Sequence, residues 1–470
     1  MDSIWTTTSG LCPREALCEN LTADAVVIGG GIAGILTAWL LQEKGVDTVL
    51  LEADRICSGQ TGNTTAKITL QHGLIYHKLI EKSGREQAGL YAEANRLAIA
   101  EYERIIEEKK LECGFRRCSS YLYSRTETER LRQEAEAAHS LGICARFTKQ
   151  TELPFEVKGA LRFYDQAVFH PLLFLKELAA ELRIYEQTKV TAVEGHEVIT
   201  SGGRIGAPHI VFATHYPFIN VPGFYFLRMH QERSYVLALR DTRQMDNIYY
   251  GIDQDGLSFR KSGELMLLGG GSHRTGENRE GGRYRDLRLA AEKLFPRSRE
   301  VTRWSAQDCM PADGIPYIGR YAADRPGWYV ATGFKKWGMT SAMAAGMLVS
   351  DLIIGNRNPW EEVFTPQRLN LQAAAVNLME DGMKSVHGLS KGVFSAAPCC
   401  PHMGCALEWN PDEPEEILIR QGRYLLCIKR VYYRFAAEGK IVFEFQVVLF
   451  FGRIFIYYII DSILTGSEKL

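Results

Sequence analysis

The sequence lacks an excess of either charge, and it lacks the cysteine content of a disulfide-stabilised protein. Its 55 Lys and Arg residues face 56 Asp and Glu residues, so neither nucleic acid nor an anionic membrane surface is an expected partner. Eleven cysteines among 470 residues are too sparse, and odd in number, for a disulfide scaffold. Residues 1–5 (MDSIW) show neither the basic segment nor the apolar core of a signal peptide. We therefore expect a reducing, cytoplasmic setting.

Long hydrophobic runs are also missing. Residues 441–464 are apolar and aromatic, but Glu444, Arg453 and Asp461 interrupt them. The longest charge-free stretch there, residues 445–452, is far shorter than the ~20 residues of a membrane-spanning helix. Membrane association is therefore not expected, and a buried or aggregation-prone β segment is preferred. What is present is a globular composition, 46% hydrophobic and 24% charged, over a length typical of two to four domains.

The strongest motif is a glycine-rich turn near the N-terminus. Gly29, Gly31 and Gly34 fit the pattern G-x-G-x-x-G between a β-rich run at 25–28 and a helical pattern at 35–44. In this arrangement Gly29 permits a tight turn, Gly31 lets the backbone approach a pyrophosphate, and Gly34 allows close packing of helix on strand. The pyrophosphate would lie at the helix N-terminus, where free N–H groups favour anions. The expected contacts are Gly29, Gly31, Ile32, Ala33 and Gly34.

An acidic residue follows at the spacing that this motif requires. A second strand pattern at 48–51 ends in Glu52, 18 residues after Gly34, where an acid accepts hydrogen bonds from the adenosine ribose. The motif does not choose between FAD and NAD. Residues 269–274 fail as a second G-x-G-x-x-G at their last position, which disfavours a reductase that binds two dinucleotides. A glycine-rich turn without a ligand is also disfavoured, because all parts of the motif occur in order.

The loop after Glu52 is rich in small and hydroxyl residues. Residues 57–67 read CSGQTGNTTAK. Such a loop can bring the backbone near Ala66 and the hydroxyls of Thr64 and Thr65 against a phosphate or a ring system. The alternative is a solvated surface turn.

Further strands of a nucleotide-binding domain are predicted downstream. Strand patterns cover residues 190–193, 210–215 and 328–333, and a helix rich in small residues covers about 338–354. With these motifs in this order, residues 20–355 resemble the FAD-dependent amine and amino-acid oxidoreductases, the family of D-amino acid oxidase, glycine oxidase and sarcosine oxidase. The residues that carry the resemblance are the N-terminal glycines with Glu52, the strand end Ala213-Thr214, the run Asp308–Gly319 and the turn Ala331–Gly333.

The resemblance implies an α/β fold with a discontinuous, Rossmann-type FAD-binding domain made of residues 1–80, 156–225 and 301–365. An α+β substrate domain, residues 81–155 and 226–300, would be inserted between these segments. The N–H groups at the start of the 338–354 helix would stabilise negative charge on reduced flavin; the alternative is a helix that packs on a sheet without a ligand. The further FAD contacts implied are Val190, Ala213, Thr214, Gly333, Gly338, Met339 and Thr340.

The resemblance also implies that the flavin performs most of the chemistry. A neutral amine would pass a hydride to flavin N5 and leave an imine that water hydrolyses. The candidates for orienting the substrate and favouring its uncharged amine are Lys67, Arg233, Arg260 and His273, with a structural role as the alternative for each. Arg233 or Arg260 could pair with a substrate carboxylate, because a guanidinium binds a carboxylate with two hydrogen bonds.

Cys309 lies where the sarcosine oxidase branch has a cysteine bound to the flavin through a thioether; a small buried residue is the alternative. That branch also has a lysine near flavin N5 that assists oxygen, and residues 265–273 here contain none. Either O2 or a protein could therefore be the electron acceptor.

The segment after the flavin domain resembles a Rieske module that has lost ligands. Residues 400–405 read CPHMGC, and by this resemblance Cys400 and His402 would be the ligands of a first box. A Rieske [2Fe-2S] cluster needs two Cys and two His. In the second box, this chain has Arg430 and Val431 where a Cys and a His belong, and His402 is its last histidine. A standard cluster is therefore not expected.

We interpret residues 396–440 as a degenerate, mostly-β, Rieske-like remnant that follows a linker at 366–395 and precedes an apolar tail at 441–470. Two alternatives are an altered end of the sequence and the binding of another metal, such as zinc. The candidate zinc ligands would be Cys399, Cys400, His402 and Cys405.

The sequence therefore predicts an FAD-dependent oxidoreductase that oxidises the C–N bond of a small-molecule amino acid or amine and passes electrons to O2 or a protein acceptor. Two alternatives stay open. One is a flavoprotein of the same fold that oxidises a 2-hydroxy acid, and the other is a non-catalytic flavin-binding or scaffold protein.

Overall fold

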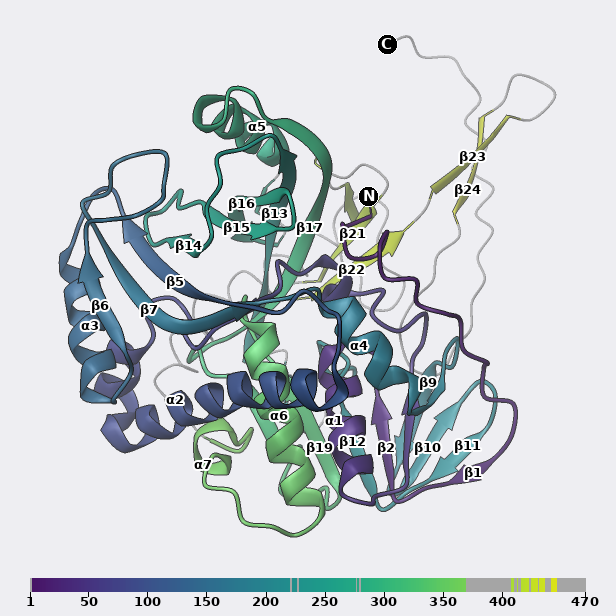
Figure 1. Cartoon of the computed structure of the whole chain (residues 1–470). Helices are drawn as coiled ribbons and strands as arrows, with labels where there is room; N and C mark the ends of the chain where they lie inside the picture. Colours follow the sequence, from purple (N-terminus) through teal and green to yellow (C-terminus); the bar gives the residue numbers. More distant parts are fainter. Residues whose placement is uncertain are drawn as a thin grey trace. The chain divides into compact units, whose positions relative to one another are not determined.

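The computed structural model describes residues 2–219, 222–225, 228–275, 277–278, 280–368 and 412, together with the backbone of five strands between residues 407 and 445 (Figure 1). The chain divides into two compact units. The first is Met1–His273 with Arg283–Asn370, and the second is Arg274–Gly282 with Leu371–Leu470.

One layer of the first unit is a six-stranded sheet in the order β18 (Tyr317–Arg320), β19 (Trp328–Thr332), β12 (His209–Phe212), β2 (Ala25–Ile28), β3 (Thr48–Leu51) and β8 (Arg183–Tyr185). β18 is antiparallel to β19, and the other neighbours are parallel. β2 and β3 are buried at every position, as expected for parallel strands that are covered on both faces.

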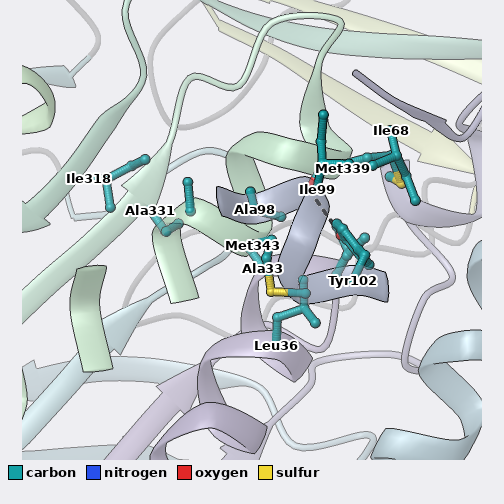
Figure 2. Close-up of a cluster of buried hydrophobic side chains, with 14 of the residues drawn as sticks. Ala33, Leu36, Ile68, Ala98, Ile99, Tyr102, Ile318, Ala331, Met339 and Met343 are labelled. Atoms are coloured by element: carbon teal, nitrogen blue, oxygen red, sulfur yellow. Dashed lines mark hydrogen bonds between the residues drawn. The ribbon is translucent and has the colours of Figure 1, made fainter. Parts of the chain in front are cut away.

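Two helices cover one face of this sheet, α1 (Ile32–Glu43) and α6 (Gly338–Ile353). Their buried residues share a hydrophobic cluster with the long helix α2 (Tyr76–Lys109), and Figure 2 shows Leu36, Ala98 and Met343 from the three helices within it. α1 and α6 approach closely because Gly346 has no side chain; a Cβ there would lie 2.9 Å from Leu40 Cδ1. Packed on the other face is a sheet in the order β1 (Leu21–Thr22), β11 (Arg204–Gly206), β10 (Glu197–Thr200) and β9 (Val190–Glu194).

A nine-stranded sheet forms the second large layer of the first unit. Its order is β17 (Arg299–Pro311), β13 (Met229–Arg240), β16 (Leu265–Arg274), β15 (Ser258–Ser262), β14 (Ile248–Gly251), β5 (Arg116–Ser124), β7 (Gly159–Val168) and β4 (Lys67–Ile68), and β6 (Ala145–Thr148) also pairs with β7.

This sheet has two faces that differ in what covers them. On the side called here the inner face, Val236, Leu267 and Trp304 join the same core cluster as α1 and α6. On the opposite side, the outer face, Tyr235 and Leu268 pack with helix α5 (Arg283–Leu294). Because successive residues of a strand point to opposite faces, the register decides which polar side chains meet on the inner face.

Helix α2 begins with a cap that another helix supplies. Glu134 of α3 (Glu129–Ser140) is fully buried, and its carboxylate accepts hydrogen bonds from the backbone N–H groups of Ile75, Tyr76 and His77 at 2.9–3.0 Å. A carboxylate here accepts hydrogen bonds from the first amides of the helix, and its negative charge interacts favourably with the positive end of the helix dipole. The remaining helices of this unit are a 3-10 turn (Gln60–Asn63), α4 (Pro171–Ala180) and α7 (Glu361–Phe364).

The predicted strands at 25–28 and 48–51 and the predicted helix at 338–354 are confirmed within one residue, and the first helix begins three residues earlier than predicted, at Ile32. The strand predicted at 210–215 is too long: β12 ends at Phe212, and the chain turns through His215, whose φ is +64°. The α/β fold itself is confirmed. Among the described residues, no helix is long and apolar enough to cross a membrane.

In the second unit, the described strands form one antiparallel sheet and one antiparallel pair. The sheet contains β20 (Leu407–Trp409), β21 (Glu416–Gln421) and β22 (Tyr424–Lys429), and the pair contains β23 (Val431–Phe435) and β24 (Ile441–Phe445). The predicted metal ligands Cys400 and His402, like Cys399 and Cys405, lie outside the described residues. The Rieske-like remnant therefore stays a prediction.

Candidate functional site

The glycine turn between β2 and α1 has the geometry that the motif predicts. Gly29 has a φ of +111°, and a Cβ there would lie 2.6 Å from the carbonyl oxygen of Ala213. A Cβ at Gly34 would lie 1.8 Å from the carbonyl oxygen of Gly29. Both positions therefore exclude any side chain, one through conformation and contact and the other through contact alone. Ala213 and Thr214, predicted as FAD contacts, adjoin this turn.

The N-terminus of α1 is contacted by a hydroxyl that sequence reasoning missed. The backbone N–H of Ile32 donates to Thr61 Oγ1 at 2.9 Å, and a Cβ at Gly31 would lie 3.1 Å from the same oxygen. Thr61 lies in the loop that the sequence singled out, but the prediction chose Thr64 and Thr65. Helix N-termini bind anions through such N–H groups. The Thr61 hydroxyl therefore lies at the place where the motif predicts a phosphate.

Thr64 and Ala66 build the end of this loop. The Thr64 hydroxyl accepts a hydrogen bond from the backbone N–H of Ala66 at 2.9 Å, and the backbone carbonyl of Thr64 accepts one from Trp5 Nε1 at 2.7 Å. Ala66 is buried with a φ of +52°. The loop is thus a built element that the N-terminal segment braces, and the solvated-turn alternative does not fit residues 64–66.

Glu52 lies against the glycine turn. Its carboxylate accepts hydrogen bonds from the backbone N–H of Gly30 at 2.6 Å and of Asp54 at 2.9 Å. Burial raises the pKa of Glu52, while the hydrogen bonds from Asp54 and Gly30 oppose that effect. The carboxylate therefore stands at the end of β3 beside the turn, where the motif places the ribose of a dinucleotide.

The start of α6 is anchored on both sides. Gly333 turns with a φ of +76°, and a Cβ there would lie 2.6 Å from Pro311 Cγ. Tyr102 Oη donates to the Met339 carbonyl at 3.0 Å, and Thr340 Oγ1 donates to the Thr69 carbonyl at 2.9 Å. By contrast, no atom lies within 4 Å of the position of a Cβ at Gly338. The first turn of α6 is thus held firmly, with open space at its first residue.

Val190, another predicted FAD contact, is buried at the start of β9, in the core on the far face of the six-stranded sheet.

A buried polar cluster lies on the inner face, and it links the loop to the nine-stranded sheet. Lys67 of β4 is 8% exposed, and its Nζ lies 5.7 Å from the centroid of the Tyr250 ring. Asp308 of β17 is paired in register with Glu232 of β13, and its carboxylate accepts a hydrogen bond from Gln60 Nε2 at 3.3 Å. The cluster also contains Lys336, whose Nζ lies 3.1 Å from Glu232 and 2.6 Å from Ser272 Oγ.

Two members of this cluster titrate near neutrality. Burial lowers the pKa of Lys67 to about 7; Arg260 and Lys336 lower it further, and Asp308 opposes them. Burial raises the pKa of Asp308 to about 7, against the effect of Lys336. Glu232, in contrast, is held at a pKa of about 2, first by His230 and despite its burial. A buried amine and a buried carboxyl that both titrate near pH 7 are suited to proton transfer.

The structure separates the four predicted catalytic residues into two pairs. Lys67 and Arg260 lie on the inner face, where Arg260 Nη2 donates to the Phe169 carbonyl at 2.6 Å. Arg233 alternates with Glu232 on β13 and therefore lies on the outer face, where it contacts Gln307 Oε1 at 3.4 Å. His273 Nε2 lies 3.1 Å from Tyr235 Oη, also on the outer face. Asp308, which sequence reasoning did not select, joins the first pair.

Cys309 lies on the side of β17 opposite to Asp308. It is fully buried in the cluster that also contains Met229 and Tyr317, and its Sγ lies 3.9 Å from Gln231 Nε2. Burial raises the pKa of Cys309 to about 12. The thiol is therefore protonated at neutral pH and is not preformed as the thiolate nucleophile.

These features fit FAD. The glycine turn, the N-terminus of α1 and a carboxylate at the end of β3 form a cradle for an ADP moiety. The open space at Gly338 lies at the start of α6, where the resemblance predicts flavin contacts. Among the residues that the structure describes, no group of three or more His, Cys, Asp or Glu is placed to hold a metal ion.

Comparisons with known proteins agree with this geometry. Residues 24–352 match the family described as FAD dependent oxidoreductase (DAO). The Bacillus subtilis (strain 168) protein named "Putative Rieske 2Fe-2S iron-sulfur protein YhfW" is 35% identical over 465 residues, which cover 88% of this chain and 91% of that protein. Gamma-glutamylputrescine oxidoreductase of Escherichia coli (strain K12) is 22% identical over 379 residues, covering 73% of this chain and 86% of that protein.

Among solved structures, glycine oxidase from Geobacillus kaustophilus has the same fold, with a TM-score of 0.62 and 20% identity. The likeness covers 74% of this chain and 99% of that one. The family match spans more than half of the chain and includes the glycine turn, the inner-face cluster and the start of α6. The chain therefore belongs to the DAO family of FAD-dependent oxidoreductases.

Proposed function

We propose that this enzyme oxidises the C–N bond of an amino acid or an amine. The observation that carries the proposal is the Lys67 amine, buried on the inner face beside Asp308 with a pKa near neutrality. Such an amine can take a proton from a substrate ammonium group, and an ammonium must become neutral before its C–H bond can give up a hydride. The names of two relatives, a gamma-glutamylputrescine oxidoreductase and a glycine oxidase, point to the same class of substrate.

The proposed FAD-binding domain comprises residues 1–80, 156–225 and 301–365, and the substrate domain comprises residues 81–155 and 226–300. All six strands of the six-stranded sheet fall within the first set, which supports this division. The nine-stranded sheet draws most of its strands from the second set; β4, β7 and all but the first two residues of β17 come from the first.

In the proposed site, the N–H groups at the start of α1 hold the pyrophosphate and Glu52 accepts from the ribose. The first amides of α6, near Gly338 and Met339, would hold the pyrimidine edge of the flavin. The chemistry that FAD supplies when bound is acceptance of a hydride equivalent, which turns an amine into an imine. Lys67 accepts the proton that the substrate ammonium loses, and water then hydrolyses the imine to a carbonyl product and ammonia or an amine.

Anaerobic titration of the FAD-loaded protein tests this function. Bleaching of the flavin bands by amino acids or amines, with release of ammonia or an amine and formation of a carbonyl product, is the expected result. Bleaching by 2-hydroxy acids alone would instead establish C–O oxidation. Flavin that stays oxidised against a broad panel of all three classes would establish a non-catalytic flavin-binding protein, and a protein that takes up no FAD would refute the whole assignment.

We propose that the C-terminal segment is a remnant without a [2Fe-2S] cluster, although one relative's name contains Rieske 2Fe-2S. The support is the replacement of the second ligand pair by Arg430 and Val431, since the cluster needs all four ligands. Iron analysis of protein purified without oxygen decides the question, because two iron atoms per chain would contradict the proposal. The rate at which air reoxidises the reduced flavin distinguishes O2 from a protein as the electron acceptor, because only an oxidase is reoxidised rapidly by O2.

A further inference from the structure

The imidazole of His215 has a buried nitrogen atom, Nε2, that has no hydrogen-bond partner among the described residues. The ring also makes a hydrogen bond with the backbone of Gln307, which raises the pKa of His215, but burial has the larger effect and lowers this pKa to about 4. The ring is therefore neutral at pH 7. A backbone group that raises the pKa of a histidine is a carbonyl that accepts from it. The other ring nitrogen thus carries the proton, and Nε2 is an acceptor.

The backbone around His215 holds this ring in place. His215 has a φ of +64°, in the left-handed region that residues with a Cβ seldom adopt. Thr332 Oγ1 donates to the His215 carbonyl at 2.6 Å, and Thr214 Oγ1 donates to the Tyr216 carbonyl at 2.8 Å. Strained conformations that their neighbours fix in this way are concentrated at ligand sites. The acceptor is thus preorganised, and a ligand that satisfies it must supply a hydrogen-bond donor.

His215 lies just beyond the carboxyl end of a central strand of the six-stranded sheet. It follows β12, which pairs with β2 on one side and with β19 on the other. Beside β2, a Cβ at Gly29 would lie 3.1 Å from Thr214 Cα, so the glycine turn packs against the residue before His215. Beside β19, Thr332 holds His215 and directly precedes Gly333. Ligands of open α/β sheets lie in the crevice beyond such strand ends.

The two turns beside His215 correspond to two different parts of FAD. Gly29 belongs to the proposed pyrophosphate site, and Gly333 belongs to the predicted flavin contacts. The part of FAD that joins the pyrophosphate to the flavin ring is the ribityl chain, whose hydroxyl groups can donate hydrogen bonds. The oxygens of the pyrophosphate, by contrast, only accept hydrogen bonds at neutral pH. The ribityl hydroxyls are therefore the donors that FAD would bring to this crevice.

We infer that His215 Nε2 accepts a hydrogen bond from a ribityl hydroxyl of FAD and so positions the chain that joins the flavin to the pyrophosphate. The inference goes beyond the proposed function, because it concerns how this protein holds its cofactor and does not depend on which bond the enzyme oxidises. The rival contact is a protonated His215 that donates to the pyrophosphate. Burial of the ring argues against that contact, because it disfavours the charged form.

The test titrates the full-length apoprotein with FAD and with FAD analogues that each lack one ribityl hydroxyl, and flavin fluorescence gives the Kd values. We expect the wild type to bind one analogue about 10-fold more weakly than FAD, because the Nε2 acceptor is then buried without a donor. His215→Phe keeps a ring but has no acceptor. It should bind FAD about 10-fold more weakly than the wild type does, and it should not distinguish FAD from that analogue.

Two controls separate this contact from a general effect on the fold. His209→Phe makes the same change at the start of β12, where the centroid of the half-buried His209 ring lies 6.0 Å from that of Tyr329 and Nδ1 has no partner among the described residues. This variant should keep the affinity for FAD and the preference for FAD over the analogue. ADP contains the pyrophosphate but no ribityl chain, so calorimetry should show that His215→Phe binds ADP as tightly as the wild type does.

The inference is wrong if the wild type binds FAD and every analogue equally, or if His215→Phe keeps the preference for FAD. An equal loss of ADP and FAD affinity in His215→Phe would show a pyrophosphate contact instead, and the same losses in His209→Phe would show a general effect on the fold. Each of these results would also overturn the inference.

If His215→Phe does not fold, His215→Asn carries the same comparison, because Asn tolerates a positive φ and its side chain is shorter than that of His. None of these titrations needs turnover. Flavin that stays oxidised with every substrate would therefore refute the proposed function and leave the role of His215 standing, whereas a protein that binds no FAD would refute both.

Discussion

Replacement of Lys67 by Met should stabilise the protein while it slows flavin reduction. The Lys67 amine is buried on the inner face, and its pKa falls from 10.5 to about 7. Burial is the main cause, and the positive charges of Arg260 and Lys336 add to it, whereas Asp308 opposes them. Met has a similar length and no charge, so Lys67→Met removes the cost of burying the amine without opening a large cavity.

The size and sign of the effect follow from proton linkage. Between pH 7 and 10.5 the unfolded chain keeps the Lys67 proton while the folded protein has lost it, so the free energy of unfolding rises with pH through this window. Below pH 7 the folded protein bears the whole free-energy cost of keeping the buried Lys67 amine charged. At ~1.4 kcal/mol per pKa unit, the shift from 10.5 to about 7 corresponds to a cost of about 5 kcal/mol. Lys67→Met should therefore gain about 4–5 kcal/mol at pH 7, and the gain should fade as the pH approaches 10.5.

Thermal unfolding of the apoprotein from pH 7 to pH 10 measures this gain. For a unit of this size, about 4 kcal/mol corresponds to a rise of roughly 5 °C in Tm. Lys261→Met is the matched control, because Lys261 makes a surface ion pair with Asp246 at 3.4 Å, and it should change stability by less than ~1 kcal/mol at every pH. A Lys67→Met gain that is absent, or that does not change with pH, would refute the reasoning. Unchanged flavin reduction by amino acids would remove Lys67 from the mechanism.

Three further predictions concern the cofactor. Gly34→Ala should abolish FAD binding and destabilise the protein by more than ~2 kcal/mol, because a Cβ there would lie 1.8 Å from a backbone oxygen; Gly89→Ala in α2, where no atom lies within 4 Å of the added Cβ, should be neutral or stabilising. Glu52→Gln should raise the Kd for FAD about 10-fold in a fluorescence titration, because a charged acceptor becomes a neutral one. Acid denaturation should release the flavin into the supernatant, because the Cys309 thiol is protonated; flavin retained on the chain would show a covalent bond.

The sequence by itself determined the dinucleotide end of the site. The constraints on Gly29, Gly34 and Glu52 act within one strand–turn–helix–strand unit, so their spacing along the chain is enough to identify them. The same holds for β2, β3 and α6, because their apolar patterns can be recognised from the local sequence alone. Even here a contact across the loop was missed: Thr61, and not Thr64, reaches the first amides of α1, because which hydroxyl of a loop faces a helix depends on how that loop folds back.

Only the tertiary structure decided the inner face. Lys67, Arg260 and Asp308 come from three strands that are far apart in sequence, and they meet through the strand order and register of the nine-stranded sheet. From the sequence, Arg233 and Arg260 were equivalent candidates, and no local pattern chose between them. The side chains of a strand alternate between two faces, so one position of register decides whether an arginine lies on the inner face or on the outer face with α5. Pairing between distant strands fixes that register, and no local pattern records it.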